Sequence, residues 1–265
     1  MEKTRLGLLL SAATLLLSTG ASANERRFSF TYESATLPQG ERELEMWTTA
    51  RIKRESFYSQ FDNRMEFEVG LSDRLQTSFY LNTTAVRAPD ATGELQSQFS
   101  FAGVSNEWKY KLMDPVADPI GFALYGELGF GSEEIELEAK LIFDKKVGRN
   151  LFALNFVGEQ EWEVESANEL HPEQKFEVDL AYAFFLTDHW SLGAEVRNTY
   201  VVDDGLEFIA LFAGPTVSYS QKNWWVTATV MPQLPALKTP EGSSGPYVLN
   251  DHERFNARLL FSFFL

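Results

Sequence analysis

The sequence predicts an all-β fold, an antiparallel up-and-down transmembrane β-barrel of about twelve strands. Three observations lead to this fold class. Polar and apolar residues alternate with period two along most of the chain after residue 41, which places successive side chains on opposite faces of a strand. Short and long connections alternate between these segments, and the apolar face carries almost no charge. The chain also ends on a run of alternating apolar residues.

Composition excludes several classes of protein. The chain has 265 residues, of which 44% are hydrophobic, with no Cys and a net charge of -15. Without thiols there are no disulfides, zinc–thiolate sites or iron–sulfur clusters. The acidic excess, with no basic run longer than a doublet, argues against a nucleic-acid partner. No cofactor and no resident metal is predicted.

The first 23 residues have the features of a secretory signal peptide. Lys3 and Arg5 precede a mostly apolar stretch at 6–17, and small residues at 21–23 follow it. This order of charged start, apolar middle and small-residue site predicts export and cleavage before Asn24. The alternative, an N-terminal membrane anchor, requires about 20 apolar residues, more than this stretch supplies.

Residues 24–41 form an N-terminal segment that does not fit the strand pattern. Phe28, Phe30 and Tyr32 alternate with polar residues, yet a thirteenth strand would place the N-terminus outside the cell, because an even strand number keeps both ends in the periplasm. The segment is expected either in the periplasm or inside the lumen as a partial plug.

The barrel domain is expected to span 42–265. Met65, Phe67, Val69 and Leu71, for example, alternate with Arg64, Glu66, Glu68 and Gly70. The same period gives candidate strands near 42–52, 61–71, 75–84, 97–111, 120–130, 134–144, 151–161, 173–184, 190–200, 207–219, 224–233 and 253–265. Tight turns stand at every second junction, whereas longer loops are expected at 85–96, 162–172 and 234–252. This alternation is typical of membrane barrels.

Two positions interrupt the pattern. Apolar residues change parity between Phe101 and Val104, which predicts a β-bulge near Gly103. Pro215 lacks a backbone donor, so it makes the boundary of the strand at 207–219 uncertain.

The apolar face could pack a soluble sandwich or contact lipid, and three features favour lipid. Twelve strands enclose more volume than one layer of side chains fills. The predicted export and the strand lengths suit a tilted membrane crossing. Aromatic residues also stand beside the tight turns, where an interfacial girdle is expected: Trp108, Tyr110, Tyr182, Trp190, Tyr219 and Trp224. The outward partner is therefore expected to be membrane lipid.

The C-terminus carries a resemblance to a known class. Apolar and aromatic residues occupy alternate positions up to the end of the chain, namely Phe255, Ala257, Leu259, Phe261, Phe263 and Leu265. This resembles the terminal strand of Gram-negative outer-membrane barrel proteins, although their usual last residue is Phe. With the strand pattern, the chain resembles the uncharacterised outer-membrane barrel families. The resemblance implies an outer-membrane location, outer-membrane lipid around the barrel and insertion by the barrel assembly machinery through Phe255 to Leu265. Oligomeric state is not indicated.

The face opposite the apolar one carries charges of both signs and is expected to line the lumen. Its members are Glu43, Glu45, Arg51, Arg64, Glu66, Glu68, Glu107, Lys109, Glu127, Glu136, Glu138, Lys140, Glu159, Lys175, Glu177, Asp179, Glu195, Arg197, Arg254 and Arg258. Closure of the barrel is expected to bring Arg254 and Arg258 near Glu43, Glu45 and Arg51. One interpretation is cross-strand pairing that holds register. The other is a pore whose acidic excess favours cations.

The sequence leaves three functions open. The first is a small channel or passive transporter with an acidic lumen, or a structural component of the outer membrane. The second is an enzyme at the outer leaflet or rim, for which Asp203, Asp204, Asp251 and His252 form the nearest constellation. These residues could bind a divalent cation or activate water, or form a solvated acidic loop surface. The third is a soluble secreted β protein.

Overall fold

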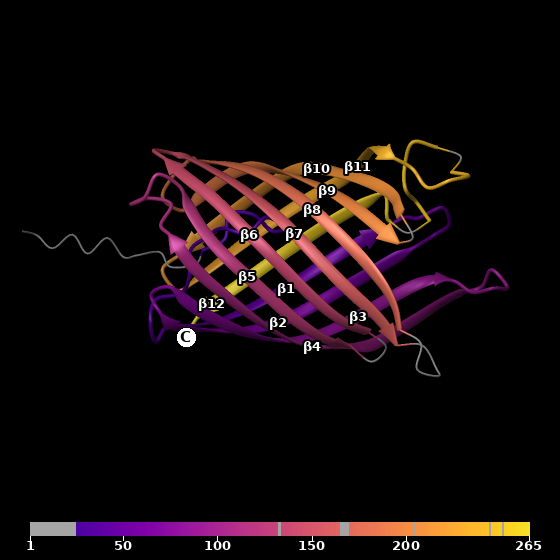
Figure 1. Cartoon of the computed structure of the whole chain (residues 1–265), viewed down its shortest axis with the longest axis horizontal. Helices are drawn as coiled ribbons and strands as arrows, with labels where there is room; N and C mark the ends of the chain where they lie inside the picture. The colour runs from indigo at the N-terminus through magenta and orange to yellow at the C-terminus, as the bar shows by residue number, and fades with distance from the viewer. Residues whose placement is uncertain (1–24, 132–133, 165–169, 204, 244, 251) are drawn as a thin grey trace, which may run out of the picture.

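A computed structural model shows a closed barrel of twelve antiparallel strands (Figure 1). It describes residues 25–131, 134–164, 170–203, 205–243, 245–250 and 252–265, with side chains for all of these except 163–164, 170–171 and 203. The strands are β1 (Arg42–Ile52), β2 (Ser59–Ser72), β3 (Leu75–Pro89), β4 (Leu95–Met113), β5 (Gly121–Gly131), β6 (Glu134–Val147), β7 (Asn150–Val164), β8 (Leu170–Phe185), β9 (Trp190–Asp203), β10 (Gly205–Gln221), β11 (Trp224–Lys238) and β12 (Phe255–Phe264). Each strand pairs with its sequence neighbours, and β1 pairs with β12 to close the barrel. In these residues no helix is long and apolar enough to cross a membrane.

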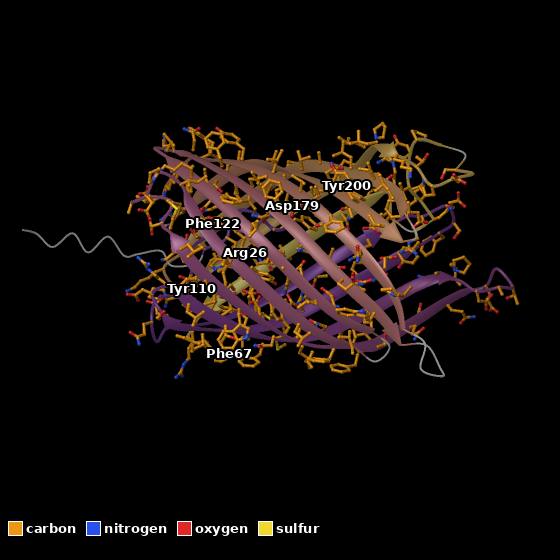
Figure 2. All side chains as sticks on the ribbon, in the orientation of Figure 1. Arg26, Phe67, Tyr110, Phe122, Asp179 and Tyr200 are labelled. Carbon is orange, nitrogen blue, oxygen red and sulfur yellow. The ribbon has the colours of Figure 1, made fainter. Side chains whose placement is uncertain are left out.

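The barrel has a charged inside and an apolar outside. On β5, Leu124 and Leu128 are each about 40% exposed on the outer face, whereas Tyr125 and Glu127 are buried in the lumen. The same alternation runs around the barrel, with Phe67 on its outer face and Asp179 buried inside (Figure 2). This arrangement is the reverse of a soluble protein and matches a transmembrane barrel. The predicted fold class is confirmed.

The two ends of the barrel differ. The turn-side end carries the connections 73–74, 114–120, 148–149, 186–189 and 222–223, and the C-terminus lies there (Figure 1). The loop-side end carries, among the described connections, 53–58, 90–94 and the loop that joins β11 to β12. Aromatic rings continue around the turn-side end from Trp190 to Tyr219, Trp224 and Phe261, with centroid separations of 4.6, 5.4 and 5.8 Å. They occupy the position expected of an interfacial girdle.

Most strands are longer than the alternation predicted, although β1 and β5 have the predicted length and β12 is shorter. β3 and β4 continue to Pro89 and Leu95, which pair with each other, so the expected loop at 85–96 shrinks to a turn at 90–94. β11 likewise extends to Lys238. The prediction ended these strands too early because alternation weakens where neither face is required to be apolar, beyond the membrane.

Both predicted irregularities are present. The register between β3 and β4 shifts between Asn82 and Thr83, whose partners are Gly103 and Phe101, so the bulge lies where it was predicted. Gly103 has φ of 146°, and a Cβ there would lie 2.3 Å from the carbonyl oxygen of Phe130. Pro215 lies inside β10, where the pairing with β11 is interrupted between residues 212 and 216. Its missing donor therefore falls on the β11 side.

Candidate functional site: a plugged lumen with a loop-side cavity

The N-terminal segment, residues 25–41, lies inside the turn-side half of the lumen; the predicted signal peptide at 1–23 lies outside the described residues. Phe28 and Leu37 are fully buried, and Phe30 and Tyr32 are 5% exposed. Phe28, Phe30 and Tyr32 belong to three separate apolar clusters of the barrel wall, and the cluster of Phe30 includes Val201 and Phe208. Of the two placements that the sequence left open, the structure has the one inside the lumen.

Glu195 on β9 is the main anchor of this segment. Its carboxylate accepts hydrogen bonds from three successive backbone amides, those of Ser29 (2.9 Å), Phe30 (2.9 Å) and Thr31 (2.7 Å). Thr229 adds a hydroxyl donor at 2.6 Å. Glu195 is fully buried, so its negative charge is compensated by these donors, which also fix the path of the segment.

Three further polar side chains hold the rest of the segment. Asn155 accepts from the amide of Tyr32 (2.6 Å) and donates to its carbonyl (3.0 Å), as a neighbouring strand would. Asp144 accepts from the hydroxyl of Ser34 at 2.5 Å. A fourth contact, from the Leu37 amide to the Gln76 side chain, spans 3.0 Å. The segment is thus held by side chains, with no strand of its own among the elements described.

Sequence reasoning missed Asn155, Asp144 and Gln76. Each is a buried polar residue at an inward position of a strand. The signal was available, because Asn155 stands between the outward Leu154 and Phe156 in the alternating pattern. Their hydrogen-bond partners could not be predicted, because these belong to a segment more than 35 positions away in the chain.

Five acidic side chains surround the segment at the turn-side end and are at most 3% exposed: Glu43, Glu45, Glu66, Glu68 and Glu107. Arg26 of the segment forms an ion pair with Glu45 at 3.3 Å and stacks on Tyr32. Burial without a counter-charge is costly, so Arg26 compensates part of this acidic shell. Carboxylate oxygens of Glu45, Glu66 and Glu68 lie within 4.8 Å of one another.

The expected closeness of Arg258 to Glu43 and Glu45 is not found. The register of β1 and β12 pairs Thr49 with Arg258 and Glu45 with Ser262. Arg258 therefore lies level with Thr49, which is further along β1 toward the loop-side end than Glu45. Arg26 of the N-terminal segment forms the ion pair with Glu45 instead. Arg254 precedes β12 at that end, where it donates to the carbonyl of Gln233 and to Tyr247.

The loop between β11 and β12 folds into the loop-side end. Val248 is buried against Phe30, Phe208, Phe212 and Met231. Its amide donates to the Gln233 side chain at 2.8 Å, and the Gln233 amide donates back to its carbonyl at 2.9 Å. The loop and the N-terminal segment therefore meet inside the barrel, through Phe30.

His252 of the same loop packs its ring edge-on to Phe208 and Phe212, with centroid distances of 5.2 and 5.9 Å. Burial lowers its pKa to about 3, and the charges of Arg51 and Arg197 act in the same direction. His252 is therefore neutral at physiological pH. Of the other residues of the predicted rim constellation, Asp204, Asp251 and the side chain of Asp203 lie outside the described residues, so the rim site stays a prediction.

A cavity of about 760 Å³ occupies the loop-side half of the lumen. Phe30, Tyr32 and Trp47 line it where it meets the N-terminal segment. Its wall carries eleven acidic and seven basic side chains among the residues described, namely Asp62, Glu127, Glu134, Glu136, Glu138, Glu159, Glu161, Glu173, Glu177, Asp179 and Glu207 with Arg51, Arg54, Arg64, Lys140, Lys175, Arg197 and Arg258.

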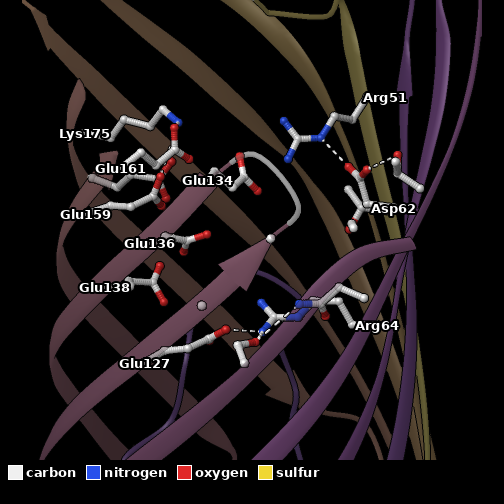
Figure 3. A pocket seen from close by; sticks show the side chains of 18 of the residues that line it. Arg51, Asp62, Arg64, Glu127, Glu134, Glu136, Glu138, Glu159, Glu161 and Lys175 are labelled. Carbon is white, nitrogen blue, oxygen red and sulfur yellow. Dashed lines mark hydrogen bonds and ion pairs between the residues drawn. The ribbon is translucent and has the colours of Figure 1, made fainter. Parts of the chain in front are cut away.

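The charges of this cavity are segregated. Figure 3 shows Glu134, Glu136, Glu138, Glu159 and Glu161 on one side, with Arg51 and Arg64 across from them. On the acidic side, Lys175 bridges Glu159 (3.3 Å), Glu161 (2.7 Å) and Glu173 (3.1 Å), and Lys140 binds Glu138 at 2.5 Å. The wall therefore presents opposite potentials on its two sides.

The arginine side is partly paired. Arg51 binds Asp62 at 2.8 Å, Arg197 binds Glu177 at 2.6 Å, and Arg64 binds Glu127. Cross-strand pairing, the first interpretation of these charges, thus occurs at several positions.

The lumen charges predicted from the sequence divide into two groups. Glu43, Glu45, Glu66, Glu68, Glu107, Lys109 and Glu195 lie in the buried turn-side half, whereas Arg51, Arg64, Glu127, Glu136, Glu138, Lys140, Glu159, Lys175, Glu177, Asp179, Arg197 and Arg258 line the cavity. Arg254 lies before β12, outside both groups.

Solved structures resemble this barrel at low sequence identity. The NanC porin aligns with a TM-score of 0.56 and 9% identity over 84% of this chain and 99% of NanC. The KdgM porin gives 0.50 and 9% over 83% and 98%. The β domain of the Bordetella autotransporter BrkA gives 0.50 and 8% over 86% and 100%. These likenesses establish the fold of an outer-membrane β-barrel and confirm the resemblance inferred from the sequence.

No curated protein matches the sequence. The model of DUF6662, a family of unknown function, matches residues 20–264. Because the match covers nearly the whole chain, the protein belongs to the DUF6662 family.

Proposed function

We propose that the protein is an outer-membrane passive transporter for small polar solutes, with a preference for cations over anions. The observation that carries the proposal is the loop-side cavity, whose wall holds eleven acidic and seven basic side chains. Carboxylates in a narrow aqueous passage attract cations and repel anions. The likeness of the barrel to the NanC and KdgM porins supports a transport role.

The proposal includes export by the segment 1–23 and insertion through the terminal strand, Phe255 to Leu265. In this orientation the loop-side cavity faces outward and the turn-side half faces the periplasm, as in other barrels with short periplasmic turns. Cell fractionation and the heat-modifiable gel mobility of a folded barrel test it. Recovery in the aqueous periplasmic fraction would contradict a membrane location.

Passage requires the N-terminal segment to move, because it fills the turn-side half. Side-chain hydrogen bonds hold it, so it can leave without opening the barrel ladder. Each bond to a neutral group contributes about 1 kcal/mol, and bonds to a charged group contribute about twice that. A closed resting state with rare openings is the expected behaviour.

Conductance of the purified protein in planar bilayers tests the transport role. The wild type is expected to open rarely, and a Glu195→Gln variant more often. A reversal potential in a potassium chloride gradient is expected to show cation preference. Absence of channel events in both proteins, or anion preference, would refute the proposal. If neither the wild type nor Glu195→Gln conducts, the second candidate function, a structural component of the membrane, is favoured. The packed turn-side half of the lumen supports that candidate.

A further inference from the structure

Two charged side chains of the cavity wall form no ion pair within the described part of the chain. Arg258 forms no ion pair with any residue that the structure describes, and Glu136 likewise has neither an ion pair nor a hydrogen bond within the described ranges. They lie on opposite walls of the barrel, since Arg258 is on β12, Glu136 is on β6, and these two strands stand diametrically apart in the closed strand order. Charged groups in a lumen are usually paired, so both are candidates to contact a solute.

Arg258 is held in one orientation. Its guanidinium lies 4.2 Å from the ring centre of Phe30 and 4.5 Å from that of Trp47. Nε donates to Thr49 (2.7 Å), and Nη1 donates to the carbonyl of Ser29 (3.2 Å). Nη2 has no acceptor in the described part of the chain. A guanidinium fixed by aromatic rings, with donors left over, is suited to bind a carboxylate.

One buried acidic residue lies near the arginine side of the cavity. Glu253 is fully buried, and neither of its oxygens has a hydrogen-bond partner among the described residues. Its charge interacts with Arg51 and Arg197, and both of these act in turn on Arg258. Arg51 and Arg197 thus add positive potential around Arg258, which favours the approach of a carboxylate.

The acidic side is suited to an ammonium group. A carboxylate oxygen of Glu136 lies within 4.8 Å of those of Glu138 and Glu159. Lys140 and Lys175 compensate these two neighbours, which leaves Glu136 as the carboxylate to be matched. An ammonium group supplies three donors and one positive charge, which fit this set of acceptors.

We infer that the cavity binds a small zwitterion, with its carboxylate at Arg258 and its ammonium group at Glu136. A solute with only a negative charge meets the repulsion of the acidic majority, and one with only a positive charge leaves Arg258 unpaired. The cavity volume of about 760 Å³ suits a small molecule. The inference rests on the proposed function, because it takes the cavity as the place where a transported solute first binds.

Calorimetric titration of the detergent-folded protein tests this inference without a membrane. The probes are β-alanine, 4-aminobutanoate and 6-aminohexanoate, which separate the two charges by increasing lengths. Hexanoate and hexylamine are matched probes with a single charge. Arg258→Gln and Glu136→Gln remove one contact each, and Glu241→Gln, in the exposed part of the β11–β12 loop, is the matched control. Heat-modifiable mobility verifies that each variant is folded.

One amino acid is expected to bind more tightly than both single-charge probes. Its affinity is expected to fall about tenfold or more in each cavity variant and to stay unchanged in the control. Equal binding of hexanoate or hexylamine, or no binding of any amino acid, would overturn the inference. Conductance without binding would overturn it and leave the transport role standing, whereas binding without conductance would refute transport and leave a ligand site.

Discussion

The carboxylate of Glu195 accepts a hydrogen bond of 2.9 Å from the backbone amide of Phe30, a residue 165 positions earlier in the chain. This contact joins the barrel wall to the segment that fills its turn-side half. Phe30 in turn shares a buried apolar cluster with Val248 of the β11–β12 loop. One residue therefore connects the anchor of the plug with the loop that enters from the opposite end.

Replacing Glu195 with Gln is expected to loosen the N-terminal segment. Gln keeps one acceptor oxygen but brings an NH₂ group toward backbone amides, so about 2 kcal/mol of binding to the segment is lost. That loss raises the unseated fraction about thirtyfold. Limited proteolysis of the folded protein measures it as faster cleavage within residues 25–41. Equal cleavage rates in the variant and in the control Glu241→Gln would contradict the role of Glu195 as anchor.

Seating of the N-terminal segment is expected to weaken as pH rises. Burial raises the pKa of Glu33 to about 7, against the opposing effect of Arg27, whose amide donates to it at 2.6 Å; Asp144 adds to the rise. A raised carboxyl pKa means that the seated state binds the proton more tightly. Glu33 therefore stabilises the seated segment fully below pH 4.5, the pKa of the exposed group, and this stabilisation is lost as pH rises to about 7.

Proteolysis of the segment between pH 4.5 and 8 measures this effect. The rate is expected to rise with pH by up to about tenfold per unit within the window. Glu33→Gln stays neutral at every pH and should remove this part of the dependence. An unchanged profile in that variant would assign the dependence to other groups.

The β11–β12 loop is expected to respond to pH in the opposite direction. The pKa of His252 is lowered to about 3 by burial and by Arg51 and Arg197. Its contribution to loop seating is present above pH 6.5, the pKa of the exposed ring, and is lost as pH falls from there toward 3. A fluorophore on a single Cys at Ser243 should report release on acidification, since the protein has no Cys of its own. His252→Phe should abolish the response, and a response that persists would point to another group.

Phe30→Ala is expected to loosen both the N-terminal segment and the β11–β12 loop. Removing a buried phenyl ring costs about 3 to 5 kcal/mol, and this ring belongs to the apolar cluster that contains both Val248 and residues of the barrel wall. Proteolysis of the segment and the loop fluorophore should therefore change together. Phe57→Ala, a change at a side chain 52% exposed, is the matched control. A change confined to one reporter would show that the N-terminal segment and the β11–β12 loop are held independently.

Gly103→Val is expected to disrupt the bulge of β4. The added Cβ would lie 2.3 Å from the carbonyl oxygen of Phe130, and φ of 146° disfavours a β-branched residue. Folding yield, measured as the heat-modifiable fraction after refolding, should fall relative to Gly245→Val, whose Cβ meets no atom within 4 Å and whose backbone lies outside the left-handed region. An equal yield would show that β3 and β4 tolerate a different register.

The sequence by itself determined the barrel. Alternation assigns each strand residue to a face, and the short connections force neighbouring strands to pair, so strand number, closure, the bulge near Gly103 and the inward charges were all predictable. Alternation also assigned Glu195 and Arg258 to the lumen. These properties are local, because they depend on the parity of a residue within its own strand.

Only the tertiary structure decided what the inward residues contact. Parity does not fix the relative shift of strands that lie far apart in sequence, so it could not place Arg258 beside Thr49 instead of near Glu45. It also gave no position for residues 25–41, which form no strand of their own and are held largely by side chains such as Asn155. The cavity and its two charged sides follow from that placement, because the segment forms the inner end of the cavity.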